Sequence, residues 1–214
     1  EMSLLHGGSL RCCSTAAGPA FEGAGLSVGM QGADGAVDHL RVEDGALAAH
    51  VIGGGEPKGI CGSGVVDAVA CLLELELLDE TGYLEDDPAV LCGAVSLTQK
   101  DVRMIQLAKS AVCAGMRTLA HHAGLRWDEV AELIVAGGFG SYLNLESAGK
   151  IGLIPEEMTG RTRAVGNASL DGAAMMLLDT ALRSESEKMA LGAETVDLST
   201  DPVFMESYTK GMFF

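Results

Sequence analysis

The stretch Glu132-Leu-Ile-Val-Ala-Gly-Gly-Phe-Gly-Ser-Tyr-Leu-Asn144 decides the fold class, because a short apolar run stops abruptly at a cluster of glycines. Residues 133–135 predict a strand, residues 137–140 a turn, and the residues after them a helix. In open α/β sheets, ligands bind at the carboxyl ends of strands, where glycine exposes the backbone to them. The amides that begin the next helix can then face a polar or anionic group. We therefore expect an α/β protein with a ligand-binding turn here.

Two further glycine-rich segments accompany this turn. Ala16-Ala-Gly-Pro-Ala-Phe-Glu-Gly23 follows a predicted hairpin, and Gly59-Ile-Cys-Gly-Ser-Gly64 precedes a predicted helix. The amides of the second segment can meet an anion, because a helix begins there. Ordinary capping by Ser63 explains the same residues equally well. Three such segments in one chain strengthen the case for a binding site.

Hydrophobic periodicity divides the chain into hairpins followed by alternating helices and strands. Residues 2–15 and 35–52 predict hairpins, the second around an Asp44-Gly45 turn. Helices are expected at 62–78, 98–123, 168–182 and 201–210, and further strands at 163–165 and 195–198. Helix 168–182 has an apolar stripe that we expect to be buried, formed by Leu170, Ala173, Ala174, Leu177, Leu178 and Ala181. This order predicts a mixed sheet flanked by helices.

Local signals define the ends of three of these helices. Thr98-Gln-Lys-Asp101 is typical of a capping box, and Gly124 is the residue type expected just past a helix. Asp201-Pro202 predicts an N-cap followed by proline at the first helical position. Asn167 stands at a helix start, where capping is its default role.

The charge and cysteine patterns exclude several classes of protein. A net charge of −16 argues against nucleic-acid binding, and no signal peptide or membrane-spanning run is present. The acidic run 74–87 is either a solvated surface or a docking face for a basic partner. Six cysteines without a CxxC pair or metal-ligand spacing favour a reduced, cytoplasmic protein with no metal site of its own. Because the chain starts within a predicted hairpin, we expect a fragment of a longer protein.

Five ordered motifs resemble one known family, the reductive activators of corrinoid proteins, in their C-terminal ATPase region. This family belongs to the acetate and sugar kinase, Hsp70 and actin superfamily. The motifs are Cys13-Ser-Thr-Ala-Ala-Gly-Pro-Ala-Phe-Glu-Gly-Ala24, Gly59-Ile-Cys-Gly-Ser-Gly-Val-Val-Asp-Ala68, Ala136-Gly-Gly-Phe-Gly-Ser141, Ile151-Gly-Leu-Ile-Pro155 and Val165-Gly-Asn-Ala-Ser-Leu-Asp-Gly-Ala173. Together they span essentially the whole chain.

The resemblance implies a ribonuclease-H-like lobe of an actin-like ATPase that binds ATP with Mg²⁺ between two lobes. Such proteins return a corrinoid partner from Co(II) to Co(I), with an electron from an iron–sulfur domain. The family's Asp-Ile-Gly-Thr-Asn phosphate turn, its other lobe and its cluster-binding cysteines are not in this sequence. We therefore expect residues 1–214 to form a single domain, one N-terminally truncated lobe, without ATPase activity alone.

The same resemblance implies which residues face the nucleotide. Gly137, Gly138 and Phe139, with Gly140 beside them, would form the adenosine-side loop, although a purely structural turn explains them too. The remaining expected contacts are Thr15, Gly18, Gly62, Ser63 and Gly64. Glu22 is the candidate catalytic residue, holding a Mg²⁺-bound water or orienting the attacking water, or else capping a turn.

Two other functions remain open at this point. A small-molecule kinase of the same superfamily would need a catalytic acid and a substrate pocket in the other lobe. A non-catalytic module would instead grip a corrinoid protein through the acidic face 74–87. A homodimer is a further expectation, because an isolated lobe exposes apolar surface.

Overall fold

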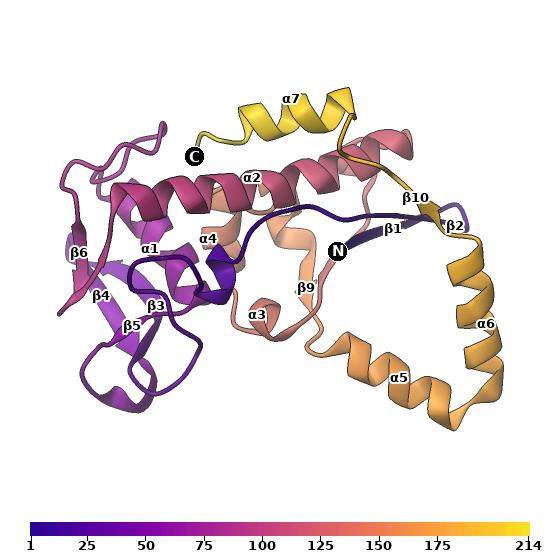
Figure 1. The fold of residues 1–214 in the computed structure, drawn as a ribbon, viewed down its shortest axis with the longest axis horizontal. Helices are drawn as coiled ribbons and strands as arrows, with labels where there is room; N and C mark the ends of the chain where they lie inside the picture. Colours follow the sequence, from indigo (N-terminus) through magenta and orange to yellow (C-terminus); the bar gives the residue numbers. More distant parts are fainter.

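A 24-residue helix, α2 (Gln99–His122), runs through the computed structural model, which describes residues 1–214 (Figure 1). Its start is the predicted capping box. The Asp101 amide donates to Thr98 Oγ1 at 3.2 Å, and the Thr98 amide donates to Asp101 Oδ2 at 2.9 Å. Gly124 follows the helix with a φ of +69°, so the sequence signals at both ends are confirmed.

Both predicted hairpins are present, each in its own small sheet. β1 (Met2–His6) pairs antiparallel with β2 (Ser9–Cys13), and β10 (Glu194–Thr195) joins β2 in parallel. β3 (Ala36–Glu43) and β4 (Ala46–Val51) form the second hairpin, and β5 (Gly59–Ile60) joins β3. Asp44 and Gly45 both have positive φ, as a two-residue turn requires. In place of the strand expected at residues 195–198, the structure has the two-residue strand β10.

Two more pairs of strands complete the fold. β8 (Leu133–Val135) pairs in parallel with β9 (Thr162–Ala164), and short helices connect them. These are α3 (Gly138–Ser141), α4 (Leu145–Lys150) and η4 (Glu156–Arg161). The hairpin of β6 (Ala89–Cys92) and β7 (Val95–Leu97) was not predicted, because its strands are too short to show alternation. The mixed α/β class is confirmed, with the strands divided among four sheets.

The main core lies between α1 (Gly62–Glu74), the β3 sheet, α2 and α4. Every residue of α1 from Gly62 to Leu72 is buried. Because α1 packs on β3 while its first turn meets α3 and the turn η1 (Ala20–Glu22), the core also holds the glycine-rich segments in place.

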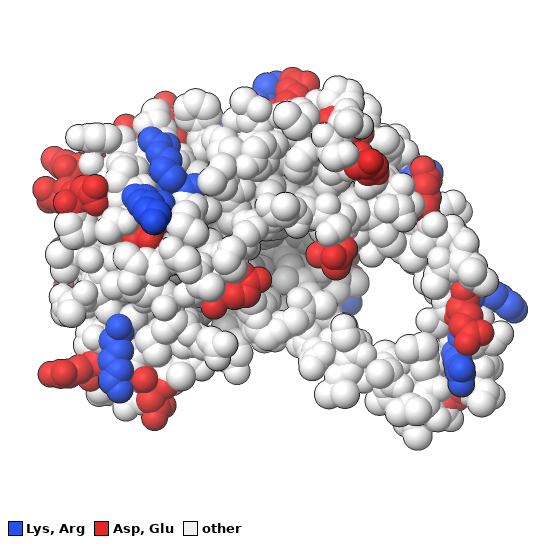
Figure 2. Space-filling view, viewed as in Figure 1, with Lys and Arg blue, Asp and Glu red and all other residues white.

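The predicted helix 168–182 is wrong in two respects. It is two helices, α5 (Ala168–Leu178) and α6 (Thr180–Leu191), because Asp179 leaves the helical conformation and accepts a hydrogen bond from the Ala181 amide. The expected buried stripe is solvent-exposed: none of Leu170, Ala173, Ala174, Leu177, Leu178 and Ala181 is buried. Figure 1 shows the two helices leaving the body after β9 and returning at β10, and Figure 2 shows an opening between them and the body. We call α5 and α6 the arm.

The last helix, α7 (Pro202–Lys210), returns the chain to the body along α2 (Figure 1). Its predicted N-cap is confirmed, because Asp201 Oδ1 accepts from the Val203 amide at 2.8 Å and from the Phe204 amide at 3.0 Å. No helix in the structure has the length and apolar character needed to cross a membrane.

Candidate functional site

The three glycine-rich segments meet at one cavity of about 830 Å³. Its walls come from η1, from the β3–β4 hairpin with the loop before it, from the first turn of α1, and from α3. Five of the predicted site residues line it: Glu22, Gly62, Ser63, Gly138 and Phe139. Segments more than 100 residues apart in sequence therefore share one surface.

The other predicted site residues lie outside the cavity lining. Gly64 sits one turn into α1, where an added Cβ would collide with the Val37 carbonyl oxygen of β3. Thr15 is half-buried, with its methyl group close to Gly115 of α2. Gly18 has a φ of +71°, and an added Cβ would meet no atom within 4 Å, so its backbone conformation alone explains it.

The glycines of the turn at residues 137–140 are present for different reasons. Gly137 has a φ of +103°, a conformation that side chains disfavour. At Gly140, an added Cβ would lie 2.5 Å from Val135 Cγ1, so packing requires glycine there. Gly138 has neither restriction: its φ is ordinary, no atom lies within 4 Å of where a Cβ would be, and it lines the cavity. The fold itself therefore does not explain this glycine.

Aromatic contact joins η1 to α3 at the cavity wall. The rings of Phe21 and Phe139 stack with centroids 5.6 Å apart and planes inclined by 25°. Gly62 lies under both, because an added Cβ would collide with the Phe21 carbonyl oxygen and would lie 3.0 Å from the Phe139 ring. The first turn of α1 can approach the two rings this closely only with glycine at position 62.

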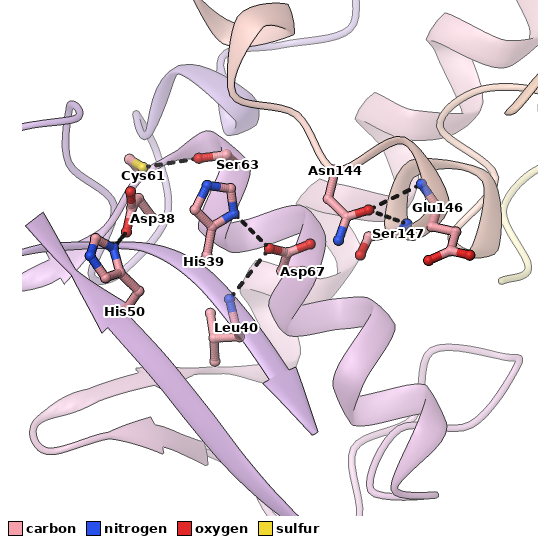
Figure 3. A network of polar contacts seen from close by, with 10 residues as sticks. All are labelled: Asp38, His39, Leu40, His50, Cys61, Ser63, Asp67, Asn144, Glu146 and Ser147. Atoms are coloured by element: carbon pink, nitrogen blue, oxygen red, sulfur yellow. Dashed lines mark hydrogen bonds and ion pairs between the residues drawn. The ribbon is translucent and has the colours of Figure 1, made fainter. Parts of the chain in front are cut away.

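The first turn of α1 has no side-chain cap. Cys61 is the N-cap residue and makes no capping hydrogen bond. The alternative that Ser63 caps the helix is wrong, because Ser63 is already inside the helix and its buried hydroxyl contacts Cys61 Sγ at 3.5 Å (Figure 3). Uncapped first-turn amides beside a cavity are groups that an anion can accept from.

Sequence reasoning missed a polar pair on the β3–β4 wall of the cavity, Asp38 and His50. Asp38 Oδ1 and His50 Nδ1 lie 2.5 Å apart, and both residues line the cavity (Figure 3). Asp38 occupies a β-bulge: Val37 pairs with Val51 and His39 pairs with His50, so Asp38 is the extra residue. A bulge redirects a side chain in a way that strand alternation does not predict. Glu22 is the other cavity carboxylate; its backbone amide donates to the Pro19 carbonyl oxygen, and its side chain makes no hydrogen bond or ion pair within the chain.

A second histidine–aspartate pair lies behind this wall and joins α1 to β3. Asp67 is buried, and its Oδ2 contacts His39 Nδ1 at 3.0 Å and accepts from the Leu40 amide at 3.3 Å (Figure 3). Since His39 and Asp38 are neighbours in β3, this pair anchors the strand from which Asp38 reaches the cavity. No three His, Cys, Asp or Glu side chains gather as a metal site.

Some carboxylates of the acidic run 74–87 interact with other residues of the chain. Glu74 pairs with Lys150 at 2.7 Å. Hydrogen bonds from Thr81 and from the Tyr83 amide to Asp79 hold the pKa of that carboxyl below its ordinary value. Figure 2 shows acidic side chains gathered at the edge of the molecule where this loop lies.

Comparison with known proteins shows what the chain is similar to. The family described as the C-terminal domain of RACo, the ASKHA domain, matches residues 1–214. A corrinoid activation enzyme, RamQ of Eubacterium limosum, is 34% identical over 94% of this chain and 39% of its own length. A reductase of Methanosarcina barkeri, named for a Co(II) methylated-amine-specific corrinoid protein, is 28% identical over 97% of this chain and 43% of its own length.

A solved structure is similar over the full length of the chain. It is a reductive activator for a corrinoid, iron–sulfur protein, with a TM-score of 0.89 and 31% sequence identity. The match covers 100% of this chain and 38% of that one. The chain thus spans about two fifths of the length of these relatives.

Proposed function

This chain belongs to the family of C-terminal ASKHA domains of RACo, and from that membership we propose that it is the ATP-binding lobe of a reductive activator. The whole protein would return a corrinoid protein from Co(II) to Co(I), the state used for methyl transfer. The names of the two curated relatives, a corrinoid activation enzyme and a Co(II) corrinoid protein reductase, support this assignment.

The observation that carries the nucleotide-binding proposal is the unexplained glycine at position 138. A glycine without conformational or packing cause, at a cavity wall and at the start of a helix, is accounted for by a ligand that contacts the backbone there. Gly137, Gly140 and Gly64 would support the ligand-binding loops from behind, and Thr15 and Gly18 would position the segment that leads to Glu22.

The remaining walls fit the parts of a magnesium nucleotide. Phe139, Tyr142 and Met30 offer aromatic and thioether surface to a purine. The uncapped amides of residues 62–64 would face the phosphate side. Glu22, whose carboxylate has no partner in the chain, would hold a Mg²⁺-bound water or orient the attacking water. Bound ATP would supply the free energy for the electron transfer.

Electron donation would come from outside this domain. The six cysteines are free, four of them buried, and three do not come together anywhere. We place the iron–sulfur cluster in another part of a longer protein, of which residues 1–214 form one domain. We also place the corrinoid partner against the acidic face 74–87, and self-association at the apolar arm.

Substitution of Gly138 tests the nucleotide site. In the full-length protein, Gly138→Val should abolish ATP-stimulated Co(II) reduction and weaken ATP binding at least tenfold, because its side chain would occupy ligand space. The melting temperature should stay near wild type, since no atom of the chain lies near the new Cβ. Gly160→Val is the matched control, because Gly160 is also unrestricted by φ or neighbours but lies outside the cavity. Normal ATP-stimulated reduction in Gly138→Val would refute the site.

The isolated domain gives a second test. By itself it should turn over no measurable ATP and show no micromolar ATP affinity by calorimetry, because the cavity lining contains no Lys or Arg to balance the phosphates. Micromolar affinity would mean that this lobe holds the nucleotide unaided.

The two surface proposals need separate measurements. The double variant Glu80→Lys with Glu85→Lys should weaken binding of the corrinoid protein and leave ATP binding unchanged. Unchanged affinity for the corrinoid protein would remove the acidic face from the interface.

Self-association through the arm should appear in analytical ultracentrifugation and disappear in the double variant Leu177→Lys with Leu178→Lys.

A further inference from the structure

We propose that Asp38 and His50 form a subsite for the vicinal hydroxyls of a ribose, so that the cavity selects ribonucleotides over deoxyribonucleotides. This inference rests on the proposed nucleotide site but concerns a different wall of it. The pair lies on the β3–β4 hairpin, whereas Gly138 and Phe139 belong to α3.

The contact between the two side chains determines what each offers to a ligand. A carboxylate oxygen only accepts, so the 2.5 Å contact requires the proton on His50 Nδ1. In the neutral form of His50 this tautomer leaves a lone pair on Nε2, and Asp38 Oδ2 has no partner in the chain. The Asp38 side chain is only 15% exposed, while His50 is 64% exposed. The pair thus presents two acceptors, one set into the wall and one at its rim.

Two adjacent acceptors discriminate among the parts of a nucleotide. Phosphates carry negative charge and are repelled by the Asp38 carboxylate. The pairing edge of adenine alternates an amino donor with a ring-nitrogen acceptor, so it satisfies only one of the two acceptors. A ribose diol carries two hydroxyl donors on neighbouring carbons and satisfies both. Carboxylates are used in the same way for ribose hydroxyls in dinucleotide-binding folds.

The fold holds this pair in place without help from a ligand. The bulge at Asp38 is fixed by the register on both sides, where Val37 pairs with Val51 and His39 with His50. The next residue, His39, is anchored to buried Asp67. The acceptors are therefore set before a ligand arrives, which limits the conformational entropy lost on binding.

Calorimetry with nucleotide analogues tests the subsite in the full-length protein. Wild type should bind MgATP about tenfold or more tightly than 2′-deoxy-ATP or 3′-deoxy-ATP, as expected for a lost hydrogen bond to a charged group. Asp38→Ala should weaken ATP about tenfold and leave at least one deoxy analogue unaffected, because that analogue already lacks the hydroxyl. Asp34→Ala, an exposed carboxylate outside the cavity lining, is the matched control and should change none of the three affinities.

The results separate failure of the ribose subsite from failure of the nucleotide site itself. Equal weakening of all three nucleotides by Asp38→Ala, or no weakening at all, would overturn the subsite while Gly138→Val still reports on the nucleotide site. If wild type binds none of the three nucleotides, both the proposed function and the subsite are wrong. Circular dichroism of Asp38→Ala checks that the hairpin remains folded, and His50→Ala provides an independent variant that should lower the ATP preference in the same direction.

Discussion

Helices α1 and α5 have similar apolar compositions and opposite surroundings. In α1, each residue from Gly62 to Leu72 is buried, including the polar Ser63 and Asp67. In α5, no residue is buried, and Leu177 and Leu178 are 87% and 89% exposed. The difference shows that an apolar helix is buried only where another element supplies a complementary surface.

Close backbone approach explains why α1 has such a surface. Gly62 and Gly64 let its first turn reach η1 and β3, where any larger residue would collide with carbonyl oxygens. The arm has no equivalent, and its helices pack mainly on each other. The first turn of α1 lines the cavity, so part of the cavity wall is continuous with the buried core.

A leucine-to-alanine substitution should give the largest difference in the free energy of unfolding between α1 and α5. Leu72→Ala removes a fully buried side chain from the core and should lower the free energy of unfolding by about 3 kcal/mol. Leu178→Ala should change it by less than about 0.5 kcal/mol, because that side chain is already in water. Urea unfolding followed by circular dichroism measures both. A large effect at Leu178 would mean that the arm is packed in solution.

Lys109 is buried in the body of the protein, and it makes the free energy of unfolding depend on pH. Burial lowers the pKa of Lys109 from its ordinary 10.5 to about 8, where its ammonium donates to the Phe213 carbonyl and lies 4.8 Å from the Phe214 ring centroid. Between pH 8 and 10.5 the unfolded chain binds more protons than the folded one, so this group makes stability rise with pH. Below pH 8 both states are charged and the burial cost is complete.

The Lys109→Met variant isolates this contribution. The stability difference between the variant and wild type should shift by about 2 kcal/mol in favour of wild type from pH 8 to about pH 10. Burial raises the thiol pKa values of Cys13 and Cys71 to about 11, which makes stability fall as pH rises. Both proteins contain these thiols, so their contribution cancels in the comparison. A pH-independent difference would mean that Lys109 is solvated.

The capping carboxylate of α2 should have the next largest effect. Burial opposes the ionisation of Asp101, but hydrogen bonds from Ser27 and Thr98 outweigh it and hold its pKa below the ordinary value. Asp101→Asn should therefore cost about 2 kcal/mol at about pH 7. As pH falls below about 4, wild type loses this stabilisation and the two proteins should converge in urea titrations. A constant gap would contradict the assignment.

Two N-caps give the smallest effects and the most local test. Asp179→Ala removes the N-cap of α6 in the arm and should speed amide hydrogen exchange there without changing the global unfolding midpoint. Asp201→Ala removes the N-cap of α7 and its 2.7 Å contact with His122, so its midpoint should fall. Equal midpoint changes would mean that the arm folds as one unit with the body.

Local chemistry explains which elements were predictable. The Asp44-Gly45 hairpin, the Thr98 capping box and the Asn167 and Asp201 caps depend on neighbours within a few residues, and all are present. The break at Asp179 is equally local, because its side chain caps the Ala181 amide, but the continuous apolar stripe led to the prediction of a single helix. Burial of that stripe depended on contacts with distant segments, which periodicity does not report.

The sequence by itself determined the α/β class, the family and the three glycine-rich segments, because each is carried by local conformational preference or by motifs in order. Only the tertiary structure decided that these segments share one cavity, that Gly138 lacks an internal cause, and that Asp38 meets His50. The bulge redirects Asp38 against the strand alternation, and the close approach of α1 joins residues far apart in sequence. Both depend on packing between elements, which no local pattern encodes.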